Sequence, residues 1–472
     1  MTTPSAGQPS AGRILLISFH YGPAAATGGF RWTRLVPLLM ERGWSFDIIT
    51  HDPVGVQDVD ERATVTTVGI PRAAMRLAML LDTAPSVPTR ILRGLLRRDT
   101  LPGVTTDAPT ARVAVTTAPP ITAQAPRSLT RRLSAAVDGL TEALRMLSWS
   151  VAAARAGRRL AQRANYAAVI VSSPPHITQW AGSKVASRAR VPLVPDFRDP
   201  WVLGIGESIR NADAVNRALG RVLEPRVNAD AACVVHNTER AQVEITADPA
   251  APAVRRVTIP NGYDLSAPPG HPDTTRFIVA FTGHLHPWMD PRPLLAACER
   301  LLDARAEARG VMSIVFMGTD REFGGVDIMQ MARAHGLHDR LTLRPRGSRE
   351  EANRLQANAA VLVAFDCTHR LCVPTKFYDY AAMRGSMLLL GHPEGAMADA
   401  AAKIGRRVRA LDDPAGIDAE LTAAFDRWTH GSFEEPNDVR GIHARVHQAD
   451  DWDALLRSIT GAARLGARDQ GS

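Results

Sequence analysis

Short apolar segments that alternate with helical ones constrain the fold of this 472-residue chain more than any other feature. "ILLIS" at Ile14–Ser18 is a continuous apolar run typical of a buried strand, and "SFDIIT" at Ser45–Thr50 is a second such run. Between them, a loop with several glycines leads to apolar residues at helical spacing from Trp32 to Met40, and Gly43 ends that helix. This strand, loop, helix, strand order predicts a parallel α/β sheet.

The alternation forms two series, which a linker separates. Further strands of the first series are expected at Ala167–Ser173, Val191–Phe197, Ala231–His236 and Arg255–Gly262, with helices after His176 and near Ala214–Val227. The linker is "SAPPGHPDT" at Ser266–Thr274, by composition. Strands of the second series are expected at Arg276–Gly283, Val311–Gly318, Leu341–Pro345, Ala359–Asp366 and Ser386–Gly391.

We therefore predict two Rossmann-like, doubly wound parallel-sheet domains, at residues 13–265 and 275–425, that face a central cleft. In such sheets ligands bind beyond the carboxyl ends of the strands, so the loops of both domains are expected to point into the cleft. Residues 426–472 are expected to form helices that pack back on the first domain. Residues 1–12 are rich in Ser, Pro and Gly and are expected to be disordered.

A basic segment at residues 71–163 interrupts the first series, with helices expected at Met75–Leu80 and Leu140–Leu160. From Arg72 to Arg163 it holds fifteen arginines and five acidic residues, whereas the whole chain has a net charge of only +8. Basic residues are thus concentrated in one helical insertion of the first domain, and no nucleic-acid partner is implied. Two interpretations stay open: a solvated insertion, or a surface that lies against anionic lipid.

Several classes of site are excluded or disfavoured. No apolar run approaches the roughly 18–20 residues that span a bilayer, and "MTTPSAGQPSAG" lacks the features of a signal peptide, so we expect a cytoplasmic protein, either free or on the inner face of the cell membrane. The chain contains no P-loop, H-E-x-x-H or G-x-S-x-G motif, and "FHYGPAAATGGF" does not match G-x-G-x-x-G. The four cysteines lack metal-ligand spacing. We expect neither a metal nor a cofactor.

Lysine occurs at only three positions, and one of them lies in "PTKFYDY" at Pro374–Tyr380. Pro374 suits a first helical turn and Thr375 a cap, which places Lys376 at a helix N-terminus with Asp379 one turn later on the same face. A cation there opposes the helix dipole unless an anion binds beside it, and phosphate is the natural candidate. Asp379 could then accept hydrogen bonds from sugar hydroxyls. A plain surface ion pair between Lys376 and Asp379 is the alternative.

Several segments of the chain resemble segments of a known enzyme family. "VPTKFYDYAAMRG" is similar to the donor-binding motif of retaining GT-B glycosyltransferases, of the family-4-like type found in bacterial surface-glycan and natural-product assembly, where "PxKxYEY(L/A)AxG" is common. "ILLISFHYGP…GGFRWTRLVPLLMERGW", "VIVSSPPH", "VPLVPDFRDPW", "VTIPNGYD" and "FTGHLHPWMDPRPLLAA" resemble other segments of the same enzymes, in the same order. Together these segments extend from about Ile14 to Phe425.

The resemblance implies a role for each matching residue. On the donor side, Gly28 and Gly29 match a loop that lets the backbone approach the donor phosphate, Gly283 begins a phosphate-contacting loop, and Asp379 binds ribose. His176 matches a histidine near the donor sugar. The other implied donor-binding residues are Arg346, Gly347, Thr375, Lys376 and Tyr380. Lys376, Asp379 and His176 are the candidate catalytic residues.

Arg198, Asp199 and Trp201 match "RDxW", which the resemblance assigns to the acceptor side of the cleft. Their alternative is an interdomain salt bridge with a packed indole. Two departures concern the donor side. The position eight residues before Asp379, where many of these enzymes have an acid, is Leu371, and the basic residues often found after Gly283 are replaced by His284 and Met289. With those basic residues absent, Arg292 or Lys376 is the residue expected to bind the diphosphate.

The resemblance implies a metal-independent hexosyl- or other glycosyltransferase that moves a sugar, with retention, from a nucleotide-sugar donor to a hydroxyl. The acceptor would be a glycan, a lipid-linked molecule or a small molecule, in the biosynthesis of surface glycans, glycolipids or natural products. A nucleotide-sugar epimerase of the same shape and a non-catalytic activator of another transferase remain alternatives. A dehydrogenase lacks its glycine fingerprint.

Overall fold

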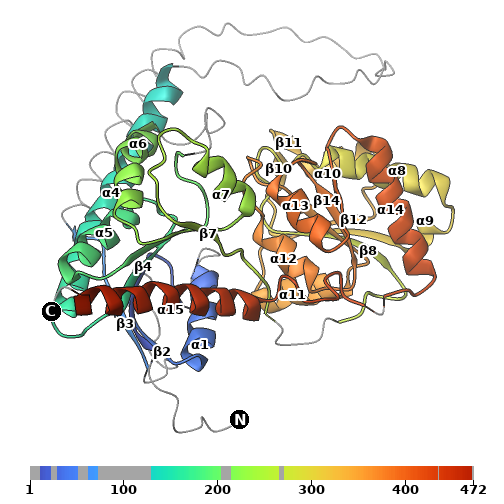
Figure 1. Ribbon diagram of the computed structural model, residues 1–472. Helices are drawn as coiled ribbons and strands as arrows, with labels where there is room; N and C mark the ends of the chain where they lie inside the picture. The colour runs from blue at the N-terminus through green and yellow to red at the C-terminus, as the bar shows by residue number, and fades with distance from the viewer. Residues whose placement is uncertain are drawn as a thin grey trace, which may run out of the picture.

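The computed structural model describes residues 11–22, 29–51, 62–72, 129–203, 214–264, 270–433 and 435–469, and the side chains at 129–138, 214 and 462–469 are excluded from that description. Two α/β domains lie side by side (Figure 1). Gly28, Met75–Leu80 and residues 1–10 of the expected tail fall outside the described residues. No helix in the described part of the chain is both long and apolar enough to cross a membrane.

The N-terminal domain is built on a seven-stranded parallel sheet in the order β3-β2-β1-β4-β5-β6-β7. Its strands are β1 (Gly12–Ser18), β2 (Trp44–Thr50), β3 (Ala63–Thr67), β4 (Ala168–Ser173), β5 (Leu193–Phe197), β6 (Val234–His236) and β7 (Arg256–Thr258). Its helices are α1 (Phe30–Glu41), α4 (Leu129–Ala161), α5 (Thr178–Ala189), α6 (Ala214–Ala229) and α7 (Glu239–Thr246). The central strands are buried on both faces, which explains why they are apolar along their whole length.

The C-terminal domain repeats this plan with a six-stranded parallel sheet in the order β12-β9-β8-β13-β14-β15. Its strands are β8 (Phe277–Thr282), β9 (Met312–Met317), β12 (Leu341–Arg344), β13 (Val361–Phe365), β14 (Ser386–Leu390) and β15 (Val408–Arg409), and a small hairpin joins β10 (Glu322–Phe323) to β11 (Val326–Asp327). Its helices are α8 (Arg292–Ala304), α9 (Ala308–Val311), α10 (Ile328–Ala334), α11 (Arg349–Asn358), α12 (Thr375–Ala381), α13 (Ala396–Lys403) and α14 (Pro414–Thr429). The two-domain architecture predicted from the sequence is confirmed.

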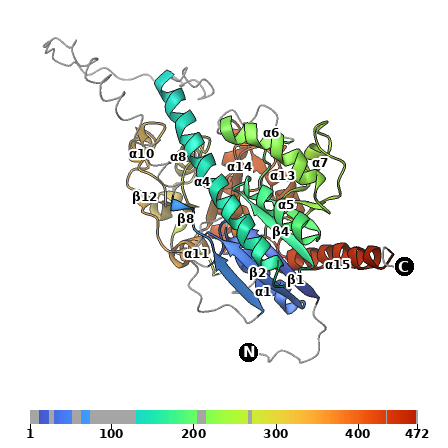
Figure 2. The ribbon, with the colours of Figure 1, turned by 90° about the vertical axis from the view of Figure 1, so that its left-hand side faces the viewer.

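The basic segment contributes α4, which is the crossover helix between β3 and β4. Met146, Trp149 and Ala153 on its inner face are buried against the sheet together with α5. The helix expected at Leu140–Leu160 is therefore part of the domain core on one side, while its arginines lie on the other. Figure 2 shows α4 running along the side of the N-terminal domain.

The final helix, α15 (Arg445–Asp469), leaves the C-terminal domain and packs on the N-terminal one (Figures 1 and 2). Trp452 is fully buried, and its ring meets that of Trp32 on α1 at a centroid distance of 4.8 Å. The two segments that cross between the domains lie side by side, because Tyr263 forms a parallel bridge with Ala444. The N-terminal domain thus includes the last helix of the chain.

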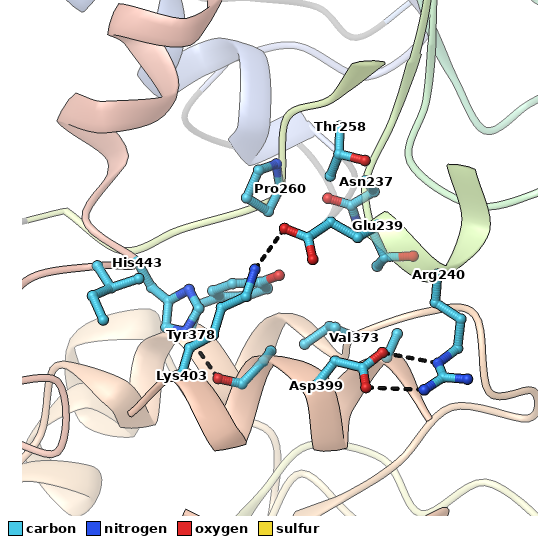
Figure 3. A pocket seen from close by; sticks show the side chains of 14 residues that line it. Asn237, Glu239, Arg240, Thr258, Pro260, Val373, Tyr378, Asp399, Lys403 and His443 are labelled. Atoms are coloured by element: carbon cyan, nitrogen blue, oxygen red, sulfur yellow. Dashed lines mark hydrogen bonds and ion pairs between the residues drawn. The ribbon is translucent and has the colours of Figure 1, made fainter. Parts of the chain in front are cut away.

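Ion pairs between α7 and α13 join the domains on one side of the cleft. Arg240 donates two hydrogen bonds to Asp399, at 2.8 and 2.9 Å, and Lys403 donates one to Glu239 at 2.7 Å. Figure 3 shows these pairs around a small cavity of about 120 Å³, with His443 beside them. These contacts form part of the interface between the two domains.

Candidate functional site

A cavity of about 560 Å³ lies at the carboxyl edge of the C-terminal sheet, where α1 of the N-terminal domain approaches it. The loops after β8, β9 and β12 bring Gly283, Gly318 and Gly347 to its wall, and Phe30 at the start of α1 closes it from the other domain. Its volume is within the range of small-molecule sites. Gly283, Arg346, Gly347, Thr375, Lys376 and Asp379 are the candidate residues that line it.

Lys376 extends its amine into this cavity without an ionic partner. No hydrogen bond or ion pair to its Nζ atom is found among the described residues, and the amine lies 5.4 Å from the centre of the Phe281 ring. Burial lowers the pKa of this ammonium, and the nearby Asp379 carboxylate opposes the shift. A partly buried cation that lacks a counter-ion is available to meet an anion that enters the cavity.

The cap of the helix that holds Lys376 lies one residue earlier than the sequence suggested. Pro374 has extended backbone angles and is the N-cap, while Thr375 is the first helical residue and its hydroxyl caps nothing. Pro374 fits this position because the N-cap residue needs no helical φ/ψ. Phe377 and Tyr380 on the same helix are completely buried, which fixes the helix against the sheet. The expected cap by Thr375 is therefore wrong.

The Lys376 side chain packs against the backbone of Gly283, where there is no Cβ atom in its way. Its φ of +118° lies in the region that glycine tolerates and side chains rarely adopt, and a Cβ atom there would lie 2.5 Å from the Nζ of Lys376. Gly283 also donates its N–H to the Met317 carbonyl at 2.6 Å, which joins the ends of β8 and β9. The backbone conformation thus favours glycine here, and a Cβ atom would force the Lys376 amine to move.

Asp379 lines the cavity one turn after Lys376 and faces Arg349 rather than the lysine. The Arg349 Nη2 atom lies 3.7 Å from its Oδ1, whereas no ion pair within 4.0 Å joins Lys376 to Asp379 in the described structure. Partial burial raises the pKa of the Asp379 carboxyl, against the charges of Arg349, Arg445 and Lys376. The simple surface pair considered from the sequence is not formed.

Arg349 connects the two domains across the cavity. It begins α11 behind a capping box, in which Ser348 and Glu351 bond each other's backbone N–H groups. Its guanidinium lies over the Phe30 ring at 4.5 Å, so one side chain contacts both α1 and the Asp379 carboxylate. Sequence reasoning did not select Arg349 or Phe30, although the S-x-x-E pattern at Ser348–Glu351 marks the helix start.

Arg292 and Tyr380 are donor-side candidates that do not line the cavity. Asp290, two residues before Arg292, accepts hydrogen bonds from its Nε at 2.9 Å and from its Nη2 at 2.5 Å. Tyr380 is fully buried, and its hydroxyl lies 3.2 Å from that of Thr282, which also accepts a hydrogen bond from Gln356. Arg292 is therefore held by a local carboxylate, and Tyr380 supports the end of β8 from behind.

Gly29 is the N-cap of α1, and its carbonyl accepts a hydrogen bond from the Thr33 hydroxyl at 2.9 Å. Its φ of −81° makes no special demand for glycine. It directly precedes Phe30, so it holds the start of α1 beside the cavity. Gly28 lies outside the described residues.

His176, Arg198, Asp199 and Trp201 gather at the carboxyl ends of β4 and β5. The His176 ring stacks between Phe197 and Trp201, with centroid distances of 6.3 and 5.7 Å, and its Nε2 lies 2.8 Å from the Asp199 carbonyl. Burial lowers the pKa of His176, which favours the neutral ring. None of these four residues lines the 560 Å³ cavity.

Arg198 is buried and binds main-chain carbonyls in its own domain. Its Nε donates to Ser173 at 2.8 Å and its Nη2 to Pro174 at 3.1 Å, and burial lowers its pKa. Asp199 instead meets the C-terminal domain, since its Oδ1 accepts a hydrogen bond from the Cys372 thiol at 3.2 Å. The contact between the domains at this point is thus a thiol–carboxylate pair.

The loop that carries Cys372 also carries Leu371, in place of the acid that the resemblance led us to look for. Leu371 is 3% exposed and packs against Leu203, Ala241 and Ile245 of the N-terminal domain. Its carbonyl accepts a 2.6 Å hydrogen bond from Thr238. Leu371 therefore takes part in the domain interface, where a carboxylate would be desolvated.

Basic side chains from three segments line the cavity. Arg346 and Arg349 lie at the end of β12, Lys376 lies on α12, and His284 and His286 follow β8. Asp379 is the only carboxylate among the described lining residues. The electrostatic character of the site favours an anionic ligand with a neutral polar group that can reach Asp379. Among the described residues, no cluster of three or more His, Cys, Asp or Glu side chains could hold a metal ion.

Comparisons with known proteins support the fold. No family model and no curated protein sequence matches the chain. Among solved structures, sucrose-phosphate synthase from Thermosynechococcus elongatus is similar at a TM-score of 0.59 and 12% identity, covering 95% of this chain and 99% of that one.

Two further structures extend the likeness over the same length. HepE from Anabaena, in complex with UDP and glucose, has a TM-score of 0.56 at 12% identity and covers 95% of this chain and 100% of that one. The α,α-trehalose 6-phosphate synthase from Burkholderia multivorans has a TM-score of 0.56 at 14% identity, with 96% and 98% covered. The chain has the GT-B fold, with two facing Rossmann-like domains.

Proposed function

We propose that this protein is a glycosyltransferase, which transfers a sugar from a nucleotide-sugar donor to an acceptor hydroxyl. The observation that carries the proposal is the Lys376 amine, which stands without a counter-ion in a basic cavity at the carboxyl edge of the C-terminal sheet. In open α/β sheets this edge is where nucleotides bind. HepE, which shares the fold, is described as a complex with UDP-glucose, and this supports a similar donor here.

The proposed catalytic role of Lys376 depends on where negative charge develops during sugar transfer. When the bond between the anomeric carbon and the diphosphate breaks, negative charge grows on the leaving group, and a fixed ammonium stabilises that state more than the ground state. Lys376 lies in a partly dry site, where such an interaction is stronger than in water. Asp379 accepts hydrogen bonds from the ribose hydroxyls in this proposal, and the charge of Arg349 favours its carboxylate form against the effect of burial.

The acceptor hydroxyl would approach from the N-terminal domain, past His176, Arg198, Asp199 and Trp201. A neutral His176 ring is suited to accept a proton from a hydroxyl, and stacking between two aromatic rings holds it in one orientation. Retention of configuration, a hexosyl group as the sugar, and a role in surface-glycan, glycolipid or natural-product biosynthesis are carried over from the family resemblance alone.

The proposal also assigns the diphosphate to protein cations instead of a metal ion. Lys376, Arg346 and Arg349 line the cavity and supply positive charge from the chain itself. Transfer is then expected to proceed unchanged in EDTA. A loss of activity in EDTA that Mg²⁺ or Mn²⁺ restores would show that metal ions complete the site.

We further propose that the outer face of α4 lies against an anionic membrane, where lipid-linked acceptors occur. Leu140 and Leu147 are 42% and 37% exposed and lie seven residues apart, close to two whole helical turns, and Arg158 follows on the same face. Val222 on the neighbouring α6 is 50% exposed and is flanked by the exposed Arg221. Exposed apolar residues beside arginines are typical of helices that bind at the lipid interface.

Liposome flotation tests this membrane proposal. The protein should float with vesicles that contain phosphatidylserine at low salt, bind less at high salt, and lose binding in the Leu147→Glu variant. Ala substitution of the exposed Arg188 on α5 is the control. Equal binding to neutral and anionic vesicles would exclude an electrostatic contact.

A thermal-shift panel of UDP, GDP and TDP and their sugars tests the transferase proposal. A ligand at about a hundred times its dissociation constant should stabilise the protein by about 2.7 kcal/mol. Lys376→Ala should keep the melting temperature of the free protein but lose this shift, and should lower transfer by about a hundredfold or more. Lys184→Ala, which removes an exposed lysine on α5, is the matched control. Wild-type transfer by Lys376→Ala would overturn the assignment.

A non-catalytic activator is the second candidate, and Leu371 is the observation that favours it. This position holds an interface leucine where related enzymes often carry an acid. An activator would form no product with any donor and acceptor, but would raise the turnover of a partner enzyme. An epimerase would convert the nucleotide-sugar without an acceptor, a transferase would form product only with one, and an activator would form product in neither case, so product analysis with and without acceptor separates the three functions.

A further inference from the structure

The loop after β8 places two histidines at the mouth of the cavity, where the sequence had suggested that Arg292 could meet a diphosphate. His284 and His286 both line the cavity together with Gly283 and Lys376. The rings of the two histidines meet edge to face at 4.9 Å. Arg292 is paired with Asp290 and does not line the cavity, so these imidazoles are the basic groups that this loop contributes to the cavity wall.

His286 is held in a defined orientation. Its ring stacks face to face on Trp288, with a centroid distance of 4.6 Å and an interplanar angle of 3°. The Trp288 indole N–H donates to the Asp366 carbonyl at 3.2 Å, and Met289 donates its N–H to the His286 carbonyl at 2.8 Å. Leu285 and Met289 are each 7% exposed and fix the loop to the core. An anchored ring of this kind costs little further ordering when it binds a ligand.

The ring nitrogens of His286 have no hydrogen-bond partner within the described part of the chain. His284, by contrast, has a carboxylate beside it, since its Nδ1 lies 3.4 Å from Asp320. Burial lowers the pKa of His286, and the charges of His284 and Lys376 lower it further. Both effects favour the neutral ring in the free protein, although it lies in a cavity that favours anions.

We propose that His286 is a second cation for the diphosphate of the donor, next to Lys376, and that donor binding takes up a proton at this ring. The inference rests on the proposed function and adds to it a pH dependence specific to this chain. A diphosphate beside His286 favours the imidazolium, so the pKa of the ring rises on binding. By linkage, affinity increases as the pH falls through the pKa of the bound form and levels off below the pKa of the free form.

Other titratable groups face the same space and must be separated from His286. They are His284 with Asp320, Asp379 on α12, and Lys376, and the charged Arg346 and Arg349 line the same cavity. Partial burial raises the pKa of Asp379, so this carboxyl also takes up a proton at low pH. Asp379 contributes equally to the pH dependence of binding in the wild type and in a variant that lacks only His286. The difference in pH dependence between the two proteins therefore measures the contribution of the His286 imidazole.

Isothermal titration calorimetry with UDP-glucose at pH 6, 7 and 8 tests the proposal, with GDP-mannose as a second probe. The phosphates of a nucleotide-sugar are both diesters and do not titrate in this range, so proton uptake belongs to the protein. Repeating each titration in two buffers of different ionisation enthalpy gives the number of protons bound. His286→Asn removes the charge, and His338→Asn, on an exposed residue that pairs with Asp339 at the opposite edge of the sheet, is the control.

The wild type and His338→Asn should bind about fivefold more tightly at pH 6 than at pH 8, and should take up a fraction of a proton. His286→Asn should bind at pH 6 as weakly as the wild type does at pH 8, with less proton uptake. Equal uptake and equal pH dependence in the wild type and His286→Asn would overturn the inference alone. No binding of either nucleotide-sugar at any pH would overturn the proposed function, and this inference with it.

Discussion

A Cβ atom at Gly283 would lie 2.5 Å from the Nζ atom of Lys376, closer than unbonded atoms approach. The end of β8 and the start of α12 thus pack together through Gly283 and Lys376. These two residues are 93 positions apart in the chain. The amine depends on this space to reach the cavity.

Gly283→Ala should displace the Lys376 amine and also strain the backbone, because φ is +118° there. We expect a loss of stability of roughly 1–3 kcal/mol and a loss of nucleotide-sugar binding, measured by urea unfolding and by thermal shift. Gly310→Ala, where no atom lies within 4 Å of the new Cβ, is the matched control. Unchanged binding by Gly283→Ala would show that the amine has another path into the cavity.

Arg349→Ala should weaken donor binding about tenfold, because Asp379 loses its counter-ion and Phe30 loses the guanidinium that lies 4.5 Å from its ring. The KM for the donor should rise while kcat changes less, since these contacts exist before the reaction. Arg354→Ala, on the exposed side of the same helix, should leave both constants unchanged. A fall in kcat alone would place Arg349 in the chemical step instead.

Glu224 should make stability fall as the pH rises. Its carboxylate is buried and accepts the N–H groups of Val202 and Leu203 at 2.8 and 3.0 Å, and burial raises its pKa to about 7. The folded form therefore binds this proton more tightly than the unfolded chain does, so the proton stabilises the fold at low pH and is lost between about pH 4.5 and pH 7.

Glu224→Gln keeps the shape of the side chain and removes the titration. Relative to the wild type, this variant should gain stability on going from pH 5 to pH 8, by on the order of 2–3 kcal/mol, in urea titrations at each pH. The exposed Glu350→Gln is the control. A constant difference across this range would mean that Glu224 is ionised throughout.

The Arg240–Asp399 pair joins the domains through two hydrogen bonds and is only partly exposed (Figure 3). A double-mutant cycle with Arg240→Ala and Asp399→Ala should give a coupling of about 0.5–1 kcal/mol in urea unfolding. The same cycle on the exposed Arg354–Glu350 pair within α11 should give less. Zero coupling at the first pair would mean that the domain contact relies on the apolar cluster around Leu371.

Much of the architecture could be predicted because the central strands are buried on both faces and are apolar throughout. β1, β4, β8, β9 and β13 all coincide with such runs to within two residues at each end. β3 and β15 were missed for a physical reason. β3 is a half-exposed edge strand rich in threonine, and β15 has only two residues. Edge strands carry too weak a hydrophobic pattern to stand out from loops.

The site could be predicted only where strand ends and helix starts bring residues together by topology. Lys376, Asp379, Gly283 and Gly347 meet because parallel strands present their loops at one edge. Arg292 begins a helix on the same edge, but its neighbour Asp290 pairs with it, which spacing alone does not reveal. The contact of Arg349 with Phe30 joins two domains and leaves no local pattern in the sequence.

The return of α15 to the N-terminal domain affects how the protein must be made. Trp452, Leu455, Leu456 and Ile459 complete one face of the first sheet, against Trp32 and its neighbours. During translation this helix leaves the ribosome after the second domain, so the first domain emerges with an uncovered apolar face until the second has been synthesised. A nascent chain that stalls before residue 445 would expose that face to chaperones and to aggregation, and final assembly of both domains becomes a post-translational event.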